Sequence, residues 1–274
     1  MSNRPQYYSI LRGADKFVDH FFGVGEAGKP ARYGTRTTYL NPKLESLTGD
    51  AAAMLSAIYS QIRLNWYTRC YRKKASTENW RCKGSVHYDR ERRGQEVILE
   101  REIVKAMPRH TWHNNVPTSS GLCSPSHDKA RNIDLVYAES PLAYTFYELK
   151  WDVNTPVFAA IEIIYRGILN VFTRLNRVEM GYGGIDMPML TVPELHLRVL
   201  APAEYYASPT IDLRWLEVKL NRGLEAFARS QVEAGLRMDF MFDAFPAGFG
   251  PPFGSSDMVR QAVIDRHPLY RRRS

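Results

Sequence analysis

Cysteine is scarce in this sequence. The chain has 274 residues but only three cysteines, Cys70, Cys82 and Cys123, and no CxxC pair. A disulfide framework normally uses an even number of cysteines, and common zinc modules use closely spaced pairs. The count therefore indicates neither kind of site. A reducing compartment, and so a cytoplasmic protein, fits this cysteine content best.

Long apolar runs and several familiar signatures are also missing. No run approaches the roughly 18 apolar residues of a membrane span, and residues 1–17 lack the apolar core of a signal peptide. We therefore expect a soluble protein with no membrane partner. The segment GYGGID at 181–186 lacks the lysine of a phosphate-binding loop, so nucleotide hydrolysis is not indicated. No internal repeat of solenoid length is present.

Positive charge, by contrast, is in excess. The sequence contains 37 Lys and Arg against 29 Asp and Glu, and 44% of its residues are hydrophobic. A packed globular protein with a polyanionic partner, nucleic acid first, is expected. Two basic runs, RCYRKK at 69–74 and RERR at 90–93, can be solvated helix ends or nucleic-acid contacts. The candidate contacts are Arg72, Lys73, Lys74, Arg92 and Arg93.

Hydrophobic periodicity divides the chain into elements. Residues 1 to about 40 have frequent turn signals and no sustained period, so irregular structure is expected there. Residues 41–74 have helical spacing and predict one long helix, with a break near Gly49 left open. Further helices are predicted over 94–107, 155–176 and 212–236, and strands over 110–117, 132–138, 143–151, 194–202 and 237–245.

The order of elements between 94 and 201 is helix, three strands, helix, strand. This order predicts an α/β protein with a central mixed sheet flanked by helices and an αβββαβ core. Three parts are expected. They are a basic N-terminal extension over 1–90, the core over 91–205, and over 206–274 a C-terminal helix, strand and Gly/Pro-rich tail packed on the core.

Charged residues interrupt two of the predicted strands. Within RNIDLVYAESPLAYTFYELKW at 131–151, Glu148 and Lys150 share one face because side chains alternate along a strand. In a paired hairpin Asp134 can lie beside Glu148. Burying such charges costs several kcal/mol unless they are paired or bind a metal. Two carboxylates on adjacent strands suit Mg²⁺ or Mn²⁺, which prefer oxygen ligands.

The helix that precedes these strands carries a third carboxylate in an unusual place. At 100° per residue, Glu100 falls near the centre of the apolar arc of this helix. Glu96 lies one turn earlier in the same arc, whereas Glu102 falls outside it. The apolar residues of the arc are Val97, Leu99, Ile103, Val104, Ala106 and Met107. Glu100 is therefore the preferred third carboxylate, with Glu96 second.

This constellation resembles the PD-(D/E)xK nuclease superfamily. The matching residues are a glutamate-bearing helix, then Asp134, then Glu148-Leu149-Lys150, then an apolar helix. The segment LEREIVKAM also resembles the first helix of archaeal Holliday-junction resolvases, where the first glutamate of a similar ERELV run serves the metal site; this likeness again favours Glu100. Ile133 stands where the family often has proline. The resemblance covers about 110 residues.

The resemblance implies a restriction-endonuclease-like core that cleaves phosphodiester bonds, with DNA favoured over RNA. Asp134, Glu148 and the backbone carbonyl of Leu149 would bind Mg²⁺ or Mn²⁺, and Glu100 would bind a second metal directly or through water. Lys150 would orient or help deprotonate the attacking water. Two-strand cleavage by this fold often implies a homodimer.

Two alternatives stay open. The same fold also occurs in inactive modules that bind nucleic acid or assemble with partner proteins. Arg166, four residues after Glu162, can form a simple intrahelical ion pair, which we slightly favour, or contact a phosphate near the metal. Arg166 and Glu96 are therefore weaker site candidates.

Overall fold

The computed structural model describes residues 9–23, 49–70, 75–82, 86, 94–123, 132–151, 155–207 and 213–270. The five expected nucleic-acid contacts, which are Arg72, Lys73, Lys74, Arg92 and Arg93, lie outside these residues.

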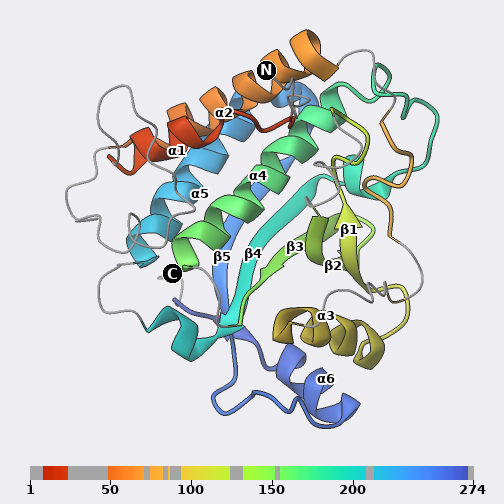
Figure 1. Cartoon of the computed structure of the whole chain (residues 1–274), viewed down its shortest axis with the longest axis vertical. Coiled ribbons are helices and arrows are strands. Elements are labelled where there is room, and N and C mark those ends of the chain that lie inside the picture. Colours follow the sequence, from red (N-terminus) through yellow and green to blue (C-terminus); the bar gives the residue numbers. More distant parts are fainter. Residues whose placement is uncertain are drawn as a thin grey trace, which may run out of the picture.

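The centre of the fold is a six-stranded mixed sheet whose spatial order follows the sequence (Figure 1). The first three strands form an antiparallel meander, β4 and β5 run parallel to β3, and the short β6 returns antiparallel. The predicted mixed α/β architecture is confirmed. The strands are β1 (Trp112–Pro117), β2 (Asn132–Ser140), β3 (Ala143–Leu149), β4 (Glu194–Pro202), β5 (Arg237–Phe245) and β6 (His267–Pro268).

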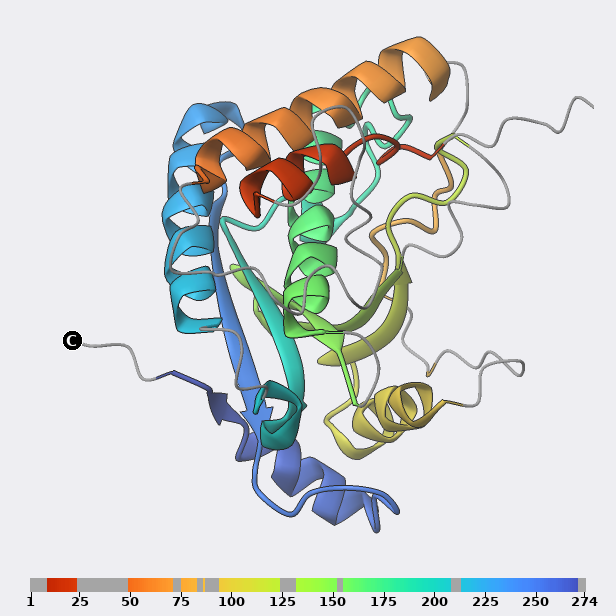
Figure 2. The same ribbon diagram turned by 60° about the vertical axis from the view of Figure 1, so that its left-hand side comes forward.

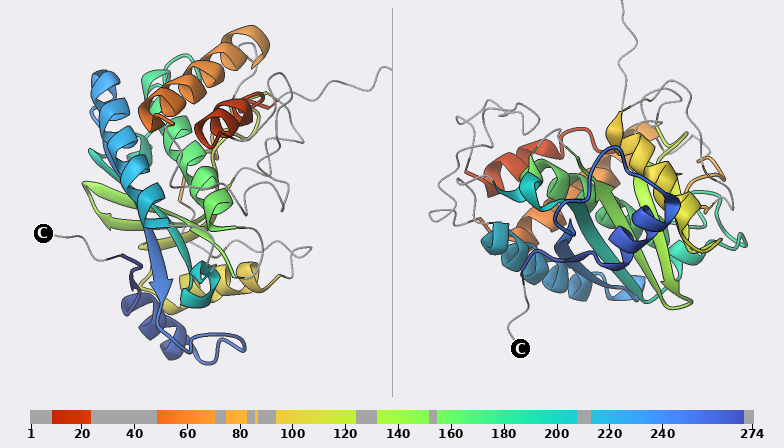
Figure 3. Two further views of the ribbon diagram at one scale, coloured as in Figure 1. Left: turned by 90° about the vertical axis from the view of Figure 1, so that its left-hand side faces the viewer. Right: turned by 90° about the horizontal axis from the view of Figure 1, so that it is seen from below.

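Helices cover the sheet in two places. On one face, α4 contacts β3 and β4 and α5 contacts β5, while α2 and α1 form an outer layer over them (Figures 2 and 3). At one end of the molecule α3 packs on α6 and β1 (Figure 1). The helices are α1 (Asp15–Phe21), α2 (Ala51–Asn65), α3 (Gln95–Ala106), α4 (Pro156–Leu175), α5 (Leu213–Ser230) and α6 (Ser256–Ile264).

Local sequence signals explain where the main helices begin. The Thr155 side chain accepts a hydrogen bond from the Phe158 backbone at the start of α4, and Pro156 occupies the first helical position. Asp50 caps α2 in the same way. A Cβ atom on Gly49 would lie only 2.3 Å from the backbone oxygen of Phe21, so the chain just before α2 requires glycine. Within the described residues, the helix predicted over 41–74 begins at Ala51, and residues 41–48 and 71–74 of that prediction lie outside them.

Helix α4 is also long and apolar enough to cross a membrane, but 89% of its most apolar window is buried inside the protein. It contacts β3, β4 and α2. A core helix of a globular protein has these properties.

Two helices depart from the sequence expectation. The segment predicted to be irregular contains α1, whose apolar side chains Val18 and Phe21 are buried against the rest of the core. The predicted Gly/Pro-rich tail contains α6, capped by the Ser255 side chain. Both helices are short, and their stability comes from packing that a periodicity count over a longer window does not register.

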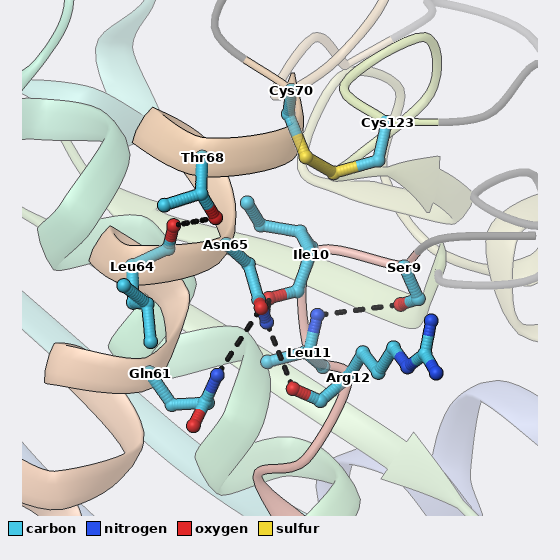
Figure 4. Close-up of a disulfide and its surroundings, with 10 residues drawn as sticks. All are labelled: Ser9, Ile10, Leu11, Arg12, Gln61, Leu64, Asn65, Thr68, Cys70 and Cys123. Atoms are coloured by element: carbon cyan, nitrogen blue, oxygen red, sulfur yellow. Dashed lines mark hydrogen bonds between the residues drawn. A yellow bond between two sulfur atoms is a disulfide. The ribbon is translucent and has the colours of Figure 1, made fainter.

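The cysteine count gave no indication of the disulfide between Cys70 and Cys123. Cys70 ends a short π-helical segment, Trp66–Cys70, and Cys123 follows β1 (Figure 4). Close by, Asn65 donates hydrogen bonds to the carbonyl oxygens of Ile10 and Arg12. The Cα atoms of the two cysteines lie 4.6 Å apart, a proximity that depends on tertiary packing. Disulfides persist mainly in oxidising compartments, which weighs against the expected reducing one.

We expect replacement of Cys70 by serine to lower the free energy of unfolding by about 4 kcal/mol, because the bond closes a long loop in the unfolded chain. Urea denaturation of the wild type and of Cys70→Ser measures this loss. Cys82→Ser is the matched control, since Cys82 is not disulfide-bonded. Thiol titration of the unfolded, unreduced wild type should find one reactive cysteine; three would contradict the bond.

Candidate active site at the carboxyl end of β3

The register of the β2–β3 hairpin brings two carboxylates opposite each other. Leu135 pairs with Tyr147 in the antiparallel ladder, and extending this register by one residue places Asp134 opposite Glu148. Residues directly opposite in an antiparallel pair lie on the same face of the sheet. The backbone N–H of Leu149 donates to Oδ2 of Asp134 at 2.9 Å, which fixes this carboxylate at the end of β3.

Lys150 directly follows β3 and lies between two carboxylates. Its Nζ atom is 2.6 Å from Oε1 of Glu148 and 3.4 Å from Oε2 of Glu162 on α4. The Lys150 and Glu148 side chains are almost fully buried, at 7% and 5% exposure. The backbone N–H of Lys150 donates to the carbonyl of Leu200 on β4, so the neighbouring parallel strand holds this residue in place.

Glu162 and Arg166, both described, do not form the intrahelical ion pair that the i,i+4 spacing suggested. Glu162 pairs with Lys150 instead. The Nε atom of Arg166 donates to the carbonyl oxygen of Asn132 at the start of β2. Arg166 therefore joins α4 to the hairpin, and its buried guanidinium lies close enough to act electrostatically on Glu162.

Helix α3 supplies two further carboxylates. Glu100 is buried, at 7% exposure, and its charge acts on Asp134. Glu96, one turn earlier, accepts a hydrogen bond from the backbone N–H of Trp151 at 3.0 Å. Glu102 instead pairs with Lys105 on the solvent side of the helix. The helical arc thus separates the two inward-facing glutamates from the outward-facing one.

Negative charge is concentrated in this site. Burial, followed by the charges of Glu148 and Glu100, raises the pKa of Asp134 well above its usual range. Burial and Glu148 raise the pKa of Glu162 to about 8, although Lys150 and Arg166 oppose this shift. Burial alone would lower the pKa of Lys150, but Glu148, Asp134 and Glu162 outweigh it and raise that pKa. A further cation would relieve this excess of negative charge.

The donor atoms fit a hard divalent cation in their chemistry. Oε2 of Glu148 is buried and has no hydrogen-bond partner among the described residues. Asp134, Glu148, Glu100 and the carbonyl of Leu149 would provide the oxygen ligands that Mg²⁺ and Mn²⁺ prefer. In the described part of the chain, however, no three His, Cys, Asp or Glu side chains are already arranged to hold a metal ion. The Lys150 ammonium instead donates a hydrogen bond to Oε1 of Glu148.

Tyr205 also belongs to this region, although no local sequence pattern indicates it. Tyr205 lies in the 3-10 helix η5 (Ala203–Tyr206), which directly follows β4. Its hydroxyl oxygen is buried without a hydrogen-bond partner among the described residues. Burial raises its pKa; Lys150 opposes the shift, and Glu96, Glu148 and Glu162 add to it. The usable signal was topological, because the carboxyl ends of adjacent parallel strands meet at one edge.

No protein-family model, curated protein or solved structure matches this chain.

Proposed function

We propose that this protein is a metal-dependent endonuclease that hydrolyses phosphodiester bonds in DNA through a PD-(D/E)xK-type site. The observation that carries the proposal is the cluster at the end of β3, where Asp134 lies opposite Glu148, Lys150 follows, and Glu100 approaches from α3. A buried lysine among several carboxylates is expensive for folding alone. Ionisable groups with strongly shifted pKa values gather at functional sites.

Each residue has a role in the proposed reaction. Asp134, Glu148, the Leu149 carbonyl and Glu100 would hold Mg²⁺ or Mn²⁺, which when bound lowers the pKa of water and neutralises phosphate charge. Lys150 would orient or help deprotonate the attacking water and stabilise the charge that develops on the phosphate oxygens. The water attacks phosphorus in line with the bond to the departing oxygen. Glu96 and Arg166 position the neighbouring backbone.

The topology supports a restriction-endonuclease-like core. Helix α3 precedes the antiparallel meander β1–β2–β3, and α4 then connects β3 to the adjacent parallel strand β4. This is the αβββαβ order expected for that core. A DNA duplex and a second copy of the chain are the proposed partners. A cytoplasmic location stays a prediction, and the Cys70–Cys123 disulfide is an argument against it.

The second candidate function is a non-catalytic module of the same fold that binds nucleic acid or assembles with partner proteins. Lys150 is held by Glu148 and Glu162, and the described residues contain no pre-arranged metal group. Both facts favour a structural role for these charges. Such a module would bind DNA in a salt-dependent manner without metal-dependent cleavage.

The deciding experiment incubates the protein with plasmid and linear DNA in Mg²⁺, in Mn²⁺ or in EDTA. We expect cutting only with a metal, and a decrease of about 10- to 100-fold in Glu100→Gln, because that carboxylate supports the metal site. Glu102→Gln is the matched control on the same helix, since Glu102 contacts Lys105 on the solvent side. Its cleavage rate should equal that of the wild type.

Three results would contradict the proposal in different ways. Cleavage that persists in EDTA would exclude the metal-dependent mechanism. Equal losses in Glu100→Gln and Glu102→Gln would show that the site assignment on α3 is wrong. A wild type that binds DNA but cuts neither DNA nor RNA would favour the non-catalytic module.

A further inference from the structure

Two adjacent tyrosines in η5 differ in the environment of their hydroxyl groups. The hydroxyl of Tyr206 lies 3.0 Å from the carbonyl oxygen of Val199 and 2.9 Å from that of Asp243, so it is satisfied by backbone. The hydroxyl of Tyr205 is also buried but has no partner among the described residues. The rings contact each other edge to face, with centroids 5.4 Å apart. Tyr206 therefore anchors η5, whereas Tyr205 has a hydroxyl donor that no described residue uses.

The sheet brings this donor to the same end of the fold as Lys150. Strand β4 lies parallel to β3, and the carbonyl of Leu200 accepts the Lys150 backbone N–H at 3.0 Å. The helix η5 begins at Ala203, directly after β4, so Tyr205 leaves the sheet at the edge where Lys150 follows β3. The charges of Lys150, Glu148 and Glu162 all act on its hydroxyl, which places the hydroxyl within electrostatic range of this cluster.

An unpartnered buried hydroxyl calls for a physical reason. A phenol removed from water loses its hydrogen bonds to the solvent, and native proteins leave few such groups unsatisfied. Ser, Thr and Tyr hydroxyls are common ligands of phosphate oxygens, which accept hydrogen bonds strongly because they carry charge. A phosphate held near the Lys150 ammonium would bring such an acceptor to the Tyr205 hydroxyl.

We propose that the Tyr205 hydroxyl donates a hydrogen bond to a non-bridging oxygen of the DNA phosphate that lies beside Lys150. The inference rests on the proposed nuclease function and assigns to it a phosphate-binding residue outside the PD-(D/E)xK signature. Tyr205 and Lys150, which follow the adjacent parallel strands β4 and β3, would then both contact one phosphate.

The test compares Tyr205→Phe with Tyr206→Phe, since each substitution removes a single oxygen atom from neighbouring residues. We expect Tyr205→Phe to raise KM for a linear DNA substrate about tenfold, with kcat changed less than about threefold and no decrease in Tm. Tyr206→Phe should lower Tm by several degrees and leave KM unchanged, because its hydroxyl bonds to backbone. The two substitutions thus have opposite patterns of effect.

A binding measurement separates this inference from the proposed function. Fluorescence anisotropy gives the affinity for a fluorescein-labelled DNA duplex in Mg²⁺, for Glu100→Gln alone and for the same variant combined with Tyr205→Phe or with Tyr206→Phe. Removal of the Tyr205 hydroxyl should weaken binding about tenfold, whereas removal of the Tyr206 hydroxyl should leave the affinity unchanged.

Each contrary result has a distinct meaning. A wild type that cuts DNA, together with a Tyr205→Phe variant of unchanged KM and affinity, overturns the Tyr205 role alone. A wild type that neither binds nor cuts DNA overturns both proposals. A Tyr205→Phe variant with a lowered Tm overturns the phosphate role in favour of a structural one.

Discussion

Replacement of Lys150 by alanine is expected to slow DNA cleavage by about 10²- to 10⁴-fold, the range typical for loss of a group that moves a proton in the reaction. The ammonium of Lys150 lies 2.6 Å from Glu148 and is nearly fully buried, and alanine has no group that could replace its charge. Initial rates with plasmid DNA in Mg²⁺ measure the effect. Lys105→Ala is the matched control, because that ammonium pairs with Glu102 at the surface. Undiminished cutting by Lys150→Ala would remove Lys150 from the catalytic site.

The same substitution has a stability consequence that must be measured beside the rate. Removing one member of a buried ion pair usually costs about 3–5 kcal/mol, because the partner charge is left without compensation. Here Glu162 has a pKa raised to about 8, so it can remain protonated near neutral pH, which reduces the loss of stability. Cleavage rates should therefore be compared at a temperature where circular dichroism shows both proteins folded.

Asp134→Asn is expected to produce two large effects of opposite sign. Cleavage should fall by at least about 10²-fold, because a neutral amide is a poor ligand for a hard cation. The metal-free protein should become more stable, since burial, Glu148 and Glu100 all disfavour the charged form of Asp134. The asparagine oxygen can still accept the hydrogen bond from Leu149. Cleavage assays and urea denaturation in EDTA measure the two effects.

The pH dependence of this stabilisation follows from the direction of the pKa shift. In the unfolded chain the carboxyl of Asp134 loses its proton at about pH 3.9, whereas in the folded chain it keeps the proton to higher pH. Between these two values the native state binds more protons, so the stability of the wild type falls as the pH rises. The gain in Asp134→Asn should therefore be small at about pH 4 and increase as the pH rises toward the folded-state pKa of Asp134.

Asp239→Asn provides a control with the opposite expected sign. Although burial opposes it, a hydrogen bond from His196 and the charge of Arg198 hold the pKa of Asp239 below its usual range. Its Oδ1 atom lies 2.9 Å from His196 Nδ1 and 2.7 Å from an Arg198 nitrogen. Neutralising Asp239 should destabilise the protein at neutral pH. If both asparagine variants were destabilised equally, the electrostatic account of the candidate site would be wrong.

Much of the fold could be predicted because the deciding signals are local. Thr155 and Pro156 mark the start of α4, and the two short strand patterns around Ser140 form the hairpin β2–β3. The helix α1 and the Cys70–Cys123 bond could not be predicted in this way. Both depend on which segments meet in space, and neither has a repeating pattern in the sequence.

The candidate site could also be predicted only where its signals are local. Asp134 and Glu148 belong to one hairpin and Lys150 directly follows it, so the strand pattern was enough to bring them together, and the apolar arc of α3 predicted that Glu100 faces inward. The predicted partner of Glu162 was wrong. The i,i+4 spacing to Arg166 is a local rule, and Lys150, which follows β3, lies closer to Glu162 in space. Tyr205 was missed since nothing in its own sequence neighbourhood indicates that it lies near the end of β3 in space.

The parallel pairing of β3 with β4 has a consequence for how the molecule forms. The hairpin that carries Asp134 and Glu148 closes a short loop, whereas β4 can join β3 only after the whole crossover through α4 has been ordered. Long-range parallel pairs form slowly, because the entropy of closing the loop is lost before the contacts are gained. We therefore expect the Asp134–Glu148 pair to form early in folding and the Tyr205 side of the site to be completed late.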